Sequence, residues 1–179
     1  MQSLIQGMND ADMNSISLST NLLDQVQKFM SKKNEKLSEE LSEKYGVPSE
    51  EVAGVVESFL EDTYGPAKRL AEILAVKNET MLLFIGKKDC DICRRCEPIL
   101  ESFLENHMEL KLAKLSYSQP EGLLYHMIHD QDRGKLPLIA FLFQGKIMAV
   151  FTGECHCQTV YEKCYSDILA ECSQNIYPH

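Results

Sequence analysis

Residues 81–100 constrain the fold of this chain more than any other stretch. Residues 81–85 form an uninterrupted apolar run, which is typical of a β-strand covered on both faces, and Gly86 ends it. Two cysteines follow, Cys90 and Cys93. Apolar side chains then recur at the spacing of a helix, at Ile99, Leu100, Phe103 and Leu104. The stretch predicts a strand, a turn that carries Cys90, and a helix that begins beside it.

The predicted position of Cys90, just ahead of a helix, favours a reactive thiol. Unpaired backbone N–H groups and the positive end of the helix dipole stabilise a thiolate there. Because Cys93 lies one helical turn further on, the pair can attack a disulfide, form a mixed disulfide and then close on itself. We therefore predict Cys90 as the nucleophile and Cys93 as the resolving thiol.

The composition narrows the range of functions. The chain has 179 residues, 44% of them hydrophobic, and a formal net charge of −9, which argues against nucleic acid and anionic membrane surfaces as partners. No apolar run approaches the roughly 18 residues of a membrane span. The N-terminus lacks the pattern of a secretory signal, so the expected location is cytoplasmic. An odd number of cysteines, seven, makes a stapling disulfide framework improbable and points to redox or metal chemistry.

The chain ahead of the cysteine motif is predicted to be helical. Residues 1–18 are polar and aperiodic and are expected to be a disordered leader, whereas residues 19–78 show helical periodicity. Ser19 or Thr20 is the expected first N-cap, and Gly46 ends the first helical stretch. One long kinked helix and two short helices fit that stretch equally well.

A second helix is predicted to open at Pro48, since proline and acidic residues suit a first helical turn. Gly65-Pro66 is expected to break this helix, and a third helical piece follows it.

The remaining strands are predicted after the cysteine helix. Residues 110–117 form a strand candidate with Leu110, Leu112 and Leu115 as its buried members, and a Pro-Glu-Gly turn leads from it into a short helix. Residues 137–143 and 146–152, joined by Gln144-Gly145, have the pattern of an apolar β-hairpin. The apolar stripe of a last helix is then marked by Val160, Cys164, Ile168 and Cys172.

From about Met81 to Asn175 the chain resembles the thioredoxin superfamily. Pro98 lies five residues past Cys93, and Pro137 opens the hairpin where the family has a cis-proline. Gly153 stands at the end of the final strand, where the family has a glycine beside the active site. The resemblance implies an α/β, thioredoxin-like fold for residues 79–179, with a central four-stranded mixed sheet flanked by helices and with an N-terminal all-α extension.

The resemblance also implies a function, that of a thiol–disulfide oxidoreductase that exchanges the Cys90/Cys93 dithiol with protein disulfides. Such a protein needs no bound cofactor and receives electrons from an upstream reductase. The backbone at Leu136 and Pro137 would pair with an extended substrate peptide, next to Gly153. A buried acid of many thioredoxins corresponds here to Phe84, so proton transfer to Cys93 would use water or another group.

The motif Cys155-His156-Cys157 follows Gly153, so the resemblance places it in the loop that flanks the C-x-x-C pair. Cys155 and Cys157 could form a second dithiol, or could join Cys90 and Cys93 as four ligands of zinc or an iron–sulfur cluster. No metal is predicted, because the Pro137 ring would occupy the space beside the sulfurs.

The remaining cysteines and the histidines are predicted to be structural or surface residues, and a different class of function stays open. Free cysteines are often small core residues, which is the interpretation for Cys96, Cys164 and Cys172. The histidines outside the C-H-C motif are expected at the surface. The alternative functions are a non-catalytic interaction module or redox sensor, with a dimer or a partner protein bound through the N-terminal helices, and a metal or iron–sulfur binding protein that uses Cys90, Cys93, Cys155 and Cys157.

Overall fold

The structure, a computed structural model, describes residues 19–129 and 135–174, and the predicted leader at 1–18 lies outside them. One mixed sheet has the strand order β1-β5-β4-β2-β3. β2 (Met81–Gly86) and β3 (Lys111–Ser116) are parallel, whereas β4 (Leu138–Phe143) is antiparallel to both β2 and β5 (Lys146–Thr152). The four predicted strands are confirmed. The fifth strand, β1 (Thr20–Asn21), has two residues and pairs with the start of β5.

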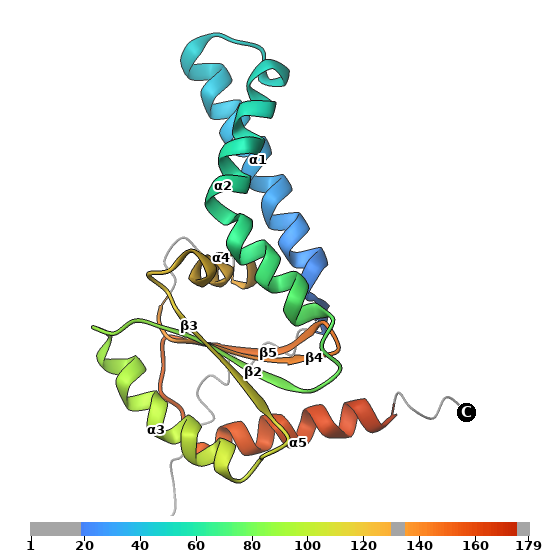
Figure 1. Cartoon of the computed structure of the whole chain (residues 1–179), viewed down its shortest axis with the longest axis vertical. Helices are drawn as coiled ribbons and strands as arrows, with labels where there is room; N and C mark the ends of the chain where they lie inside the picture. Colours follow the sequence, from blue (N-terminus) through green and yellow to red (C-terminus); the bar gives the residue numbers. More distant parts are fainter. Residues whose placement is uncertain (1–18, 130–134, 175–179) are drawn as a thin grey trace, which may run out of the picture.

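Helices cover both faces of the sheet (Figure 1). α1 (Leu22–Tyr45), α2 (Ser49–Ala75) and α4 (Leu124–Ile128) lie on one face, and the 3₁₀-helix η1 (Pro120–Leu123) leads into α4. α3 (Asp91–Glu105) and α5 (Gln158–Gln174) lie on the other face. The α/β class and the N-terminal helical extension are therefore confirmed. None of the described helices is both long and apolar enough to cross a bilayer.

β2 is the central strand of the core, and all six of its residues are buried. Because side chains alternate along a strand, Leu83 and Ile85 face α1, α2 and α4, and Leu82 and Phe84 face α3 and α5. β3 pairs only with β2 and forms an edge of the sheet. The prediction that Leu112 is buried was wrong, since it lies at that edge and is 41% exposed.

The N-terminal helices form a hairpin of two unbroken helices. Neither Ser19 nor Thr20 caps α1; instead the Asn21 side chain accepts the backbone N–H groups of Leu23 (2.9 Å) and Asp24 (3.2 Å). Gly46 ends α1 with φ 66°, as predicted. The 24 residues of α1 correspond to a length of about 36 Å.

α2 does not break at Gly65-Pro66, and that prediction was wrong. The helix continues to Ala75 with Pro66 inside it. Its last third is held by tertiary packing, because Ala67, Ala71 and Leu74 are buried in the core above the sheet. Burial of this turn therefore outweighs the local cost of the proline.

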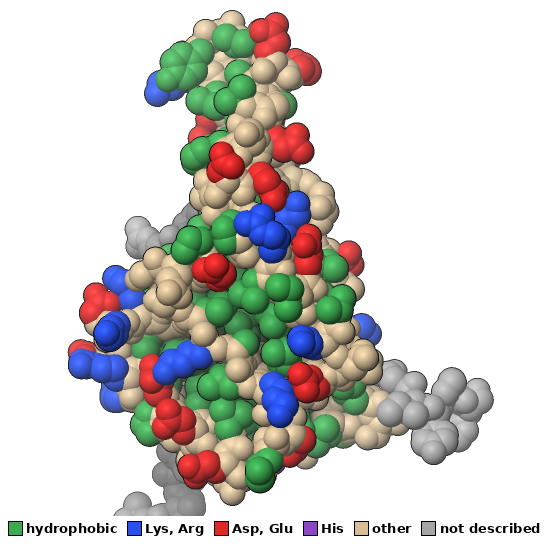
Figure 2. Space-filling model, in the orientation of Figure 1, with side chains coloured by type: hydrophobic (Ala, Val, Ile, Leu, Met, Phe, Trp, Pro, Cys, Tyr) green, Lys and Arg blue, Asp and Glu red, His purple; other side chains and the backbone are tan. Residues whose placement is uncertain are grey.

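Only the base of this hairpin packs on the sheet, and the rest projects away from it (Figure 1). On the projecting part, apolar and acidic side chains are exposed next to one another (Figure 2). The base is fastened at the β4–β5 turn, where the Leu22 N–H donates to the Gly145 carbonyl (2.8 Å). Gly145 has φ 74°, and a Cβ there would lie 2.7 Å from the Ala75 carbonyl oxygen. The turn is thus held between the start of α1 and the end of α2.

Candidate active site

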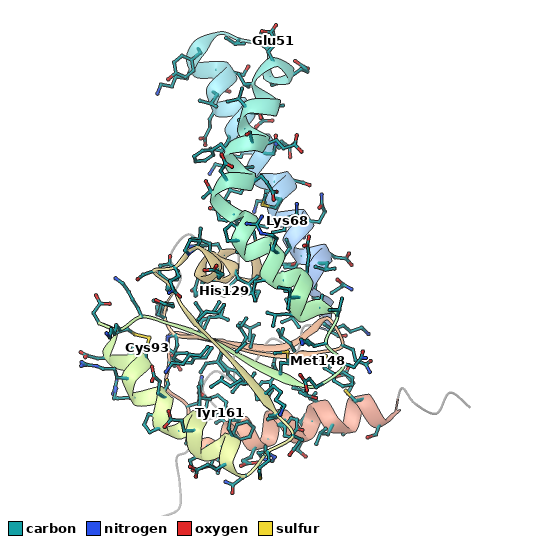
Figure 3. All side chains as sticks on the ribbon, viewed as in Figure 1. Glu51, Lys68, Cys93, His129, Met148 and Tyr161 are labelled. Atoms are coloured by element: carbon teal, nitrogen blue, oxygen red, sulfur yellow. A yellow bond between two sulfur atoms is a disulfide. The ribbon has the colours of Figure 1, made fainter. Side chains whose placement is uncertain are left out.

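Cys90 is the N-cap residue of α3, as the sequence predicts. β2 ends at Gly86, a short turn follows, and the helix starts at Asp91. The Cys90 sulfur accepts the backbone N–H of Cys93 (3.1 Å), and the two cysteines form a disulfide with Cα atoms 5.2 Å apart. Cys90 is half-buried and Cys93 is fully buried. Figure 3 shows Cys93 at the start of α3.

One of the predicted docking residues, Leu136, contacts the Cys90 sulfur, and Pro137 and Gly153 are bonded to each other beside it. The Leu136–Pro137 peptide bond is cis, and the Leu136 carbonyl oxygen lies 3.9 Å from the Cys90 sulfur. Pro137 is buried, and its carbonyl accepts the N–H of Gly153 (2.9 Å). The structure therefore brings Cys90, Cys93, Leu136, Pro137 and Gly153 together, although they come from three separate segments.

These features decide the fold. A mixed sheet carries α3 as the crossover between the parallel strands β2 and β3, a C-x-x-C disulfide opens α3, and a cis-proline precedes β4. Residues 81–174 have the thioredoxin-like fold.

Solved thioredoxin structures are similar to this chain at low sequence identity. Reduced desulfothioredoxin from Desulfovibrio vulgaris Hildenborough has a TM-score of 0.47 and 18% identity, and the match covers 54% of this chain and 88% of that one. Oxidized mitochondrial thioredoxin 3 from Saccharomyces cerevisiae has a TM-score of 0.44 and 16% identity, covering 55% and 89%. Fasciola hepatica thioredoxin has a TM-score of 0.44 and 20% identity, covering 56% and 91%. No protein-family model and no curated protein matches the chain.

The charged side chains around the thioredoxin-like disulfide pair with one another. Lys87 is 3.4 Å from Asp89, and Arg94 forms an ion pair with Asp91. All four side chains are largely exposed. Residues 87–95 carry four basic and two acidic side chains, and the α3 N-terminus adds its own positive field beside the Cys90 sulfur.

The space behind the disulfide is apolar. Phe84, which stands where many thioredoxins have a buried acid, is 2% exposed. A Cβ on Gly86 would lie 2.6 Å from the Phe84 ring and 3.5 Å from the Cβ of Cys93, so the ring and the resolving cysteine approach the same glycine. Phe84 therefore supplies no proton acceptor to Cys93.

The C-H-C motif follows Gly153, and its two cysteines lie in different environments. Cys155 is half-buried in the core beneath the sheet, whereas Cys157 is exposed and hydrogen-bonded to the Thr159 hydroxyl (3.0 Å). Both thiols are free. Within residues 19–129 and 135–174, no three or more His, Cys, Asp or Glu side chains are arranged to hold a metal ion, so the four-sulfur site has no support in the geometry.

Cys96 is the residue whose surroundings the sequence did not reveal. It is buried, as expected of a core cysteine, but its sulfur lies 3.5 Å from the carbonyl oxygen of Glu154, the residue that precedes Cys155. Burial, followed by the contact with Cys155, raises the pKa of Cys96 to about 12. The only sequence signal for this contact is the C-x-x-C-x-x-C spacing, which places Cys96 one turn past Cys93.

Proposed function

We propose that the chain is a thiol–disulfide oxidoreductase that exchanges its Cys90/Cys93 dithiol with protein disulfides. The observation that supports this is the placement of the two sulfurs. Cys90 is half-buried at the N-terminus of α3 beside the Leu136 carbonyl, and Cys93 is fully buried behind it. An attacking thiol has to be reached by its substrate, whereas a resolving thiol only has to reach the attacking one.

The exchange would proceed in two steps. In the reduced protein, the Cys90 thiolate attacks one sulfur of the substrate disulfide; that S–S bond breaks, and the first substrate thiolate leaves and takes up a proton. Cys93 then loses its proton and attacks the Cys90 sulfur, which releases the second substrate thiol and forms the Cys90–Cys93 disulfide. Two electrons pass from the dithiol to the substrate, and an upstream reductase returns them.

The backbone beside the cis-proline is proposed to hold the substrate. An extended peptide binds most readily to an unpaired edge of backbone, where carbonyl and N–H groups remain available. The Leu136 carbonyl, 3.9 Å from the Cys90 sulfur, would accept an N–H of such a peptide. The Pro137 carbonyl is already bonded to Gly153, so these two residues would shape the edge rather than bind the peptide.

The second step would rely on water as the proton acceptor for Cys93, because Phe84 replaces the buried acid. A reducing compartment such as the cytoplasm is proposed as the location, since the five cysteines outside the pair are free thiols.

The proposal is tested by reduction of insulin with dithiothreitol as the electron donor. We expect the wild type to accelerate the reaction and Cys90→Ser to reduce it to the rate with dithiothreitol alone. Cys93→Ser should retain the first step and accumulate a mixed disulfide with the substrate. Cys172→Ser, which removes a thiol from the far end of α5, is the matched control and should keep the wild-type rate. Full activity of Cys90→Ser would rule out the proposed mechanism.

A second candidate function is an interaction module, which the projecting helical hairpin favours. Tyr45 (63% exposed), Val55 (69%) and Phe59 (57%) are large apolar side chains on the part of the hairpin that does not pack on the sheet. We propose that this surface binds a second copy of the chain. Light scattering over a range of protein concentrations would show a dimer that Val55→Ser/Phe59→Ser dissociates, whereas a monomer at all concentrations would contradict it.

A further inference from the structure

Two cysteines outside the proposed active site lie close together although they are far apart in the chain. Cys96 is on α3, one turn after Cys93, and is completely buried. Cys155 is in the loop between β5 and α5 and packs against the same apolar cluster as Cys96. The Cys96 sulfur is 3.5 Å from the carbonyl oxygen of Glu154, the residue that precedes Cys155.

The surroundings of the two thiols differ in a way that suits a dithiol. Cys155 is partly exposed, so a small oxidant can reach it, whereas Cys96 has no exposed surface. Tyr161 on α5, seen beneath the sheet in Figure 3, is fully buried and belongs to the same cluster. Cys157 is directed elsewhere, since it is exposed and bonded to Thr159.

We propose that Cys96 and Cys155 are a second redox-active dithiol, which a low-molecular-weight disulfide such as glutathione disulfide oxidises to a disulfide between α3 and the β5–α5 loop. This pair goes beyond the proposed function, because it uses neither Cys90 nor Cys93. It also differs from the Cys155/Cys157 dithiol that the sequence suggests.

The oxidation balances as two thiol–disulfide exchanges. The Cys155 thiolate attacks one sulfur of glutathione disulfide, the S–S bond breaks, and one glutathione leaves as a thiolate that takes up a proton. Cys96 then loses its proton to water and attacks the Cys155 sulfur, which releases the second glutathione. Two protein thiols have been oxidised to one disulfide, and one glutathione disulfide has been reduced to two molecules of glutathione.

The second disulfide would fix one side of the proposed docking edge. Gly153 donates its N–H to the Pro137 carbonyl, and Cys155 follows it by two residues. A bond from Cys155 to α3 would therefore tie the segment that contacts Pro137 to the helix that carries Cys90 and Cys93. Oxidation of the second pair is expected to act on the first site through this segment.

The experiment uses the full chain with Cys90→Ser and Cys93→Ser, so that the first pair is silent. The protein is equilibrated with mixtures of glutathione and glutathione disulfide, and its free thiols, intact mass and linked peptides are measured. We expect the number of free thiols to fall from five to three. The mass should fall by two hydrogen atoms, with no glutathione bound, and the Cys96 peptide should be joined to the Cys155 peptide.

Three further variants in this background make the outcome decisive. Cys155→Ser should abolish the loss of two thiols, and Cys96→Ser should leave glutathione attached to Cys155. Cys157→Ser is the matched control and should form the disulfide as before. A Cys155–Cys157 link, or glutathione retained on Cys155 while Cys96 is present, would overturn the proposal. Near-ultraviolet circular dichroism establishes that each variant is folded. Insulin reduction by the chain with an intact Cys90/Cys93 pair tests the proposed function separately.

Discussion

At the scale of single residues, Cys157 and Cys164 are close in the sequence, but their surroundings shift their thiol pKa values in opposite directions. Cys157 is exposed, and hydrogen bonds from the Thr159 side chain and the Val160 backbone N–H lower its pKa. Cys164 is half-buried on α5, and burial, followed by the charge of Asp167, raises its pKa to about 11. Since only the thiolate reacts, the two should differ strongly in reactivity.

We expect iodoacetamide at neutral pH to alkylate Cys157 first among the free cysteines and Cys164 at least about a hundredfold more slowly, because each pKa unit changes the thiolate fraction about tenfold. Raising the pH to about 9 should accelerate Cys164 about tenfold per pH unit and Cys157 by a smaller factor. Peptide mass spectrometry over time measures both rates. Thr159→Val should slow Cys157 alone, and equal rates for Cys157 and Cys164 would contradict the assignment.

Gly153 is a residue at which the backbone does not tolerate a side chain. It has φ 71°, and an added Cβ would collide with the Cβ of Lys135. Gly153→Ala should therefore lower the free energy of unfolding by about 1–3 kcal/mol, and should slow insulin reduction because Gly153 holds the Pro137 carbonyl. Denaturant titration measures the change in the free energy of unfolding.

Gly54→Ala is the control for this substitution. Gly54 lies within α2, and a Cβ there meets no atom within 4 Å. The helix propensity of alanine should raise the stability by about 0.5–1 kcal/mol. A Gly153→Ala variant as stable as the Gly54→Ala variant would show that the left-handed backbone at Gly153 is not required.

At the scale of helices and strands, α2 continues through Pro66 because its last turns pack against the core. It removes a backbone donor from the interior of α2. Pro66→Ala should restore that hydrogen bond and raise the free energy of unfolding by about 1–3 kcal/mol, measured by denaturant titration. Pro48→Ala, at the N-cap of α2, should change it by less than about 0.5 kcal/mol. A loss of stability in Pro66→Ala would mean that the proline ring is needed for packing.

The end of α3 is joined to α5 through His107. Its Nε2 lies 2.5 Å from the Glu162 carboxylate, and its Nδ1 lies 3.4 Å from Glu109. The hydrogen bond with His107, and then that from Gln158, lowers the pKa of the Glu162 carboxyl. A carboxyl whose pKa is lowered by folding stabilises the protein above its unfolded pKa, and this contribution is lost as the pH falls through the folded value.

Glu162→Gln should therefore lower the melting temperature near neutral pH, and its difference from the wild type should shrink as the pH falls below about 4.5. The change should be modest, because the pair is partly exposed. Glu101→Gln, an exposed site on α3, is the control and should follow the wild type. A difference between Glu162→Gln and the wild type that grows at low pH would contradict the direction assigned to Glu162.

The elements that the sequence predicts are those whose signals are local. The apolar run of β2, the turn at Gln144-Gly145 and the N-terminal position of Cys90 depend on neighbouring residues, and all were confirmed. The placement of Pro137 and Gly153 near the cysteines was predicted because the resemblance linked these residues. The hydrogen bond of Gly153 to Pro137 joins segments that no local pattern connects.

The errors concern contacts between segments that are distant in the chain. The continuation of α2 depends on packing over the sheet, and the exposure of Leu112 depends on β3 being an edge strand. His107 was expected at the surface but is partly covered, because its partner Glu162 comes from α5. For the same reason the Cys96–Cys155 contact could not be predicted from spacing alone.

At the scale of the whole molecule, the helical hairpin and the sheet share one core. Val26 of α1 and Ala71 of α2 belong to the same buried cluster as Leu83 of β2 and Leu142 of β4. The predicted boundary at residue 78 separates the helical region from the sheet in the sequence. In the structure, the residues on its two sides bury each other's apolar side chains.

A fragment of residues 79–179 should accordingly lack a cooperative unfolding transition, because removal of the hairpin would expose the part of one sheet face that α1 and α2 cover. Near-ultraviolet circular dichroism during denaturant titration checks this. Met108→Ser in the full chain alters only an exposed site outside the hairpin and should unfold like the wild type. A fragment with a sharp transition would show that the sheet is stable without the hairpin.

The hydrogen bond from the Leu22 N–H to the Gly145 carbonyl also affects when the start of α1 can be anchored during synthesis. Helical hairpins consist of contacts between near neighbours in the chain and can form as soon as they are made. Here, however, the acceptor that holds the start of α1 is in the β4–β5 turn, which leaves the ribosome long after α2. The start of α1 therefore gains this hydrogen bond only after the β4–β5 turn has been synthesised.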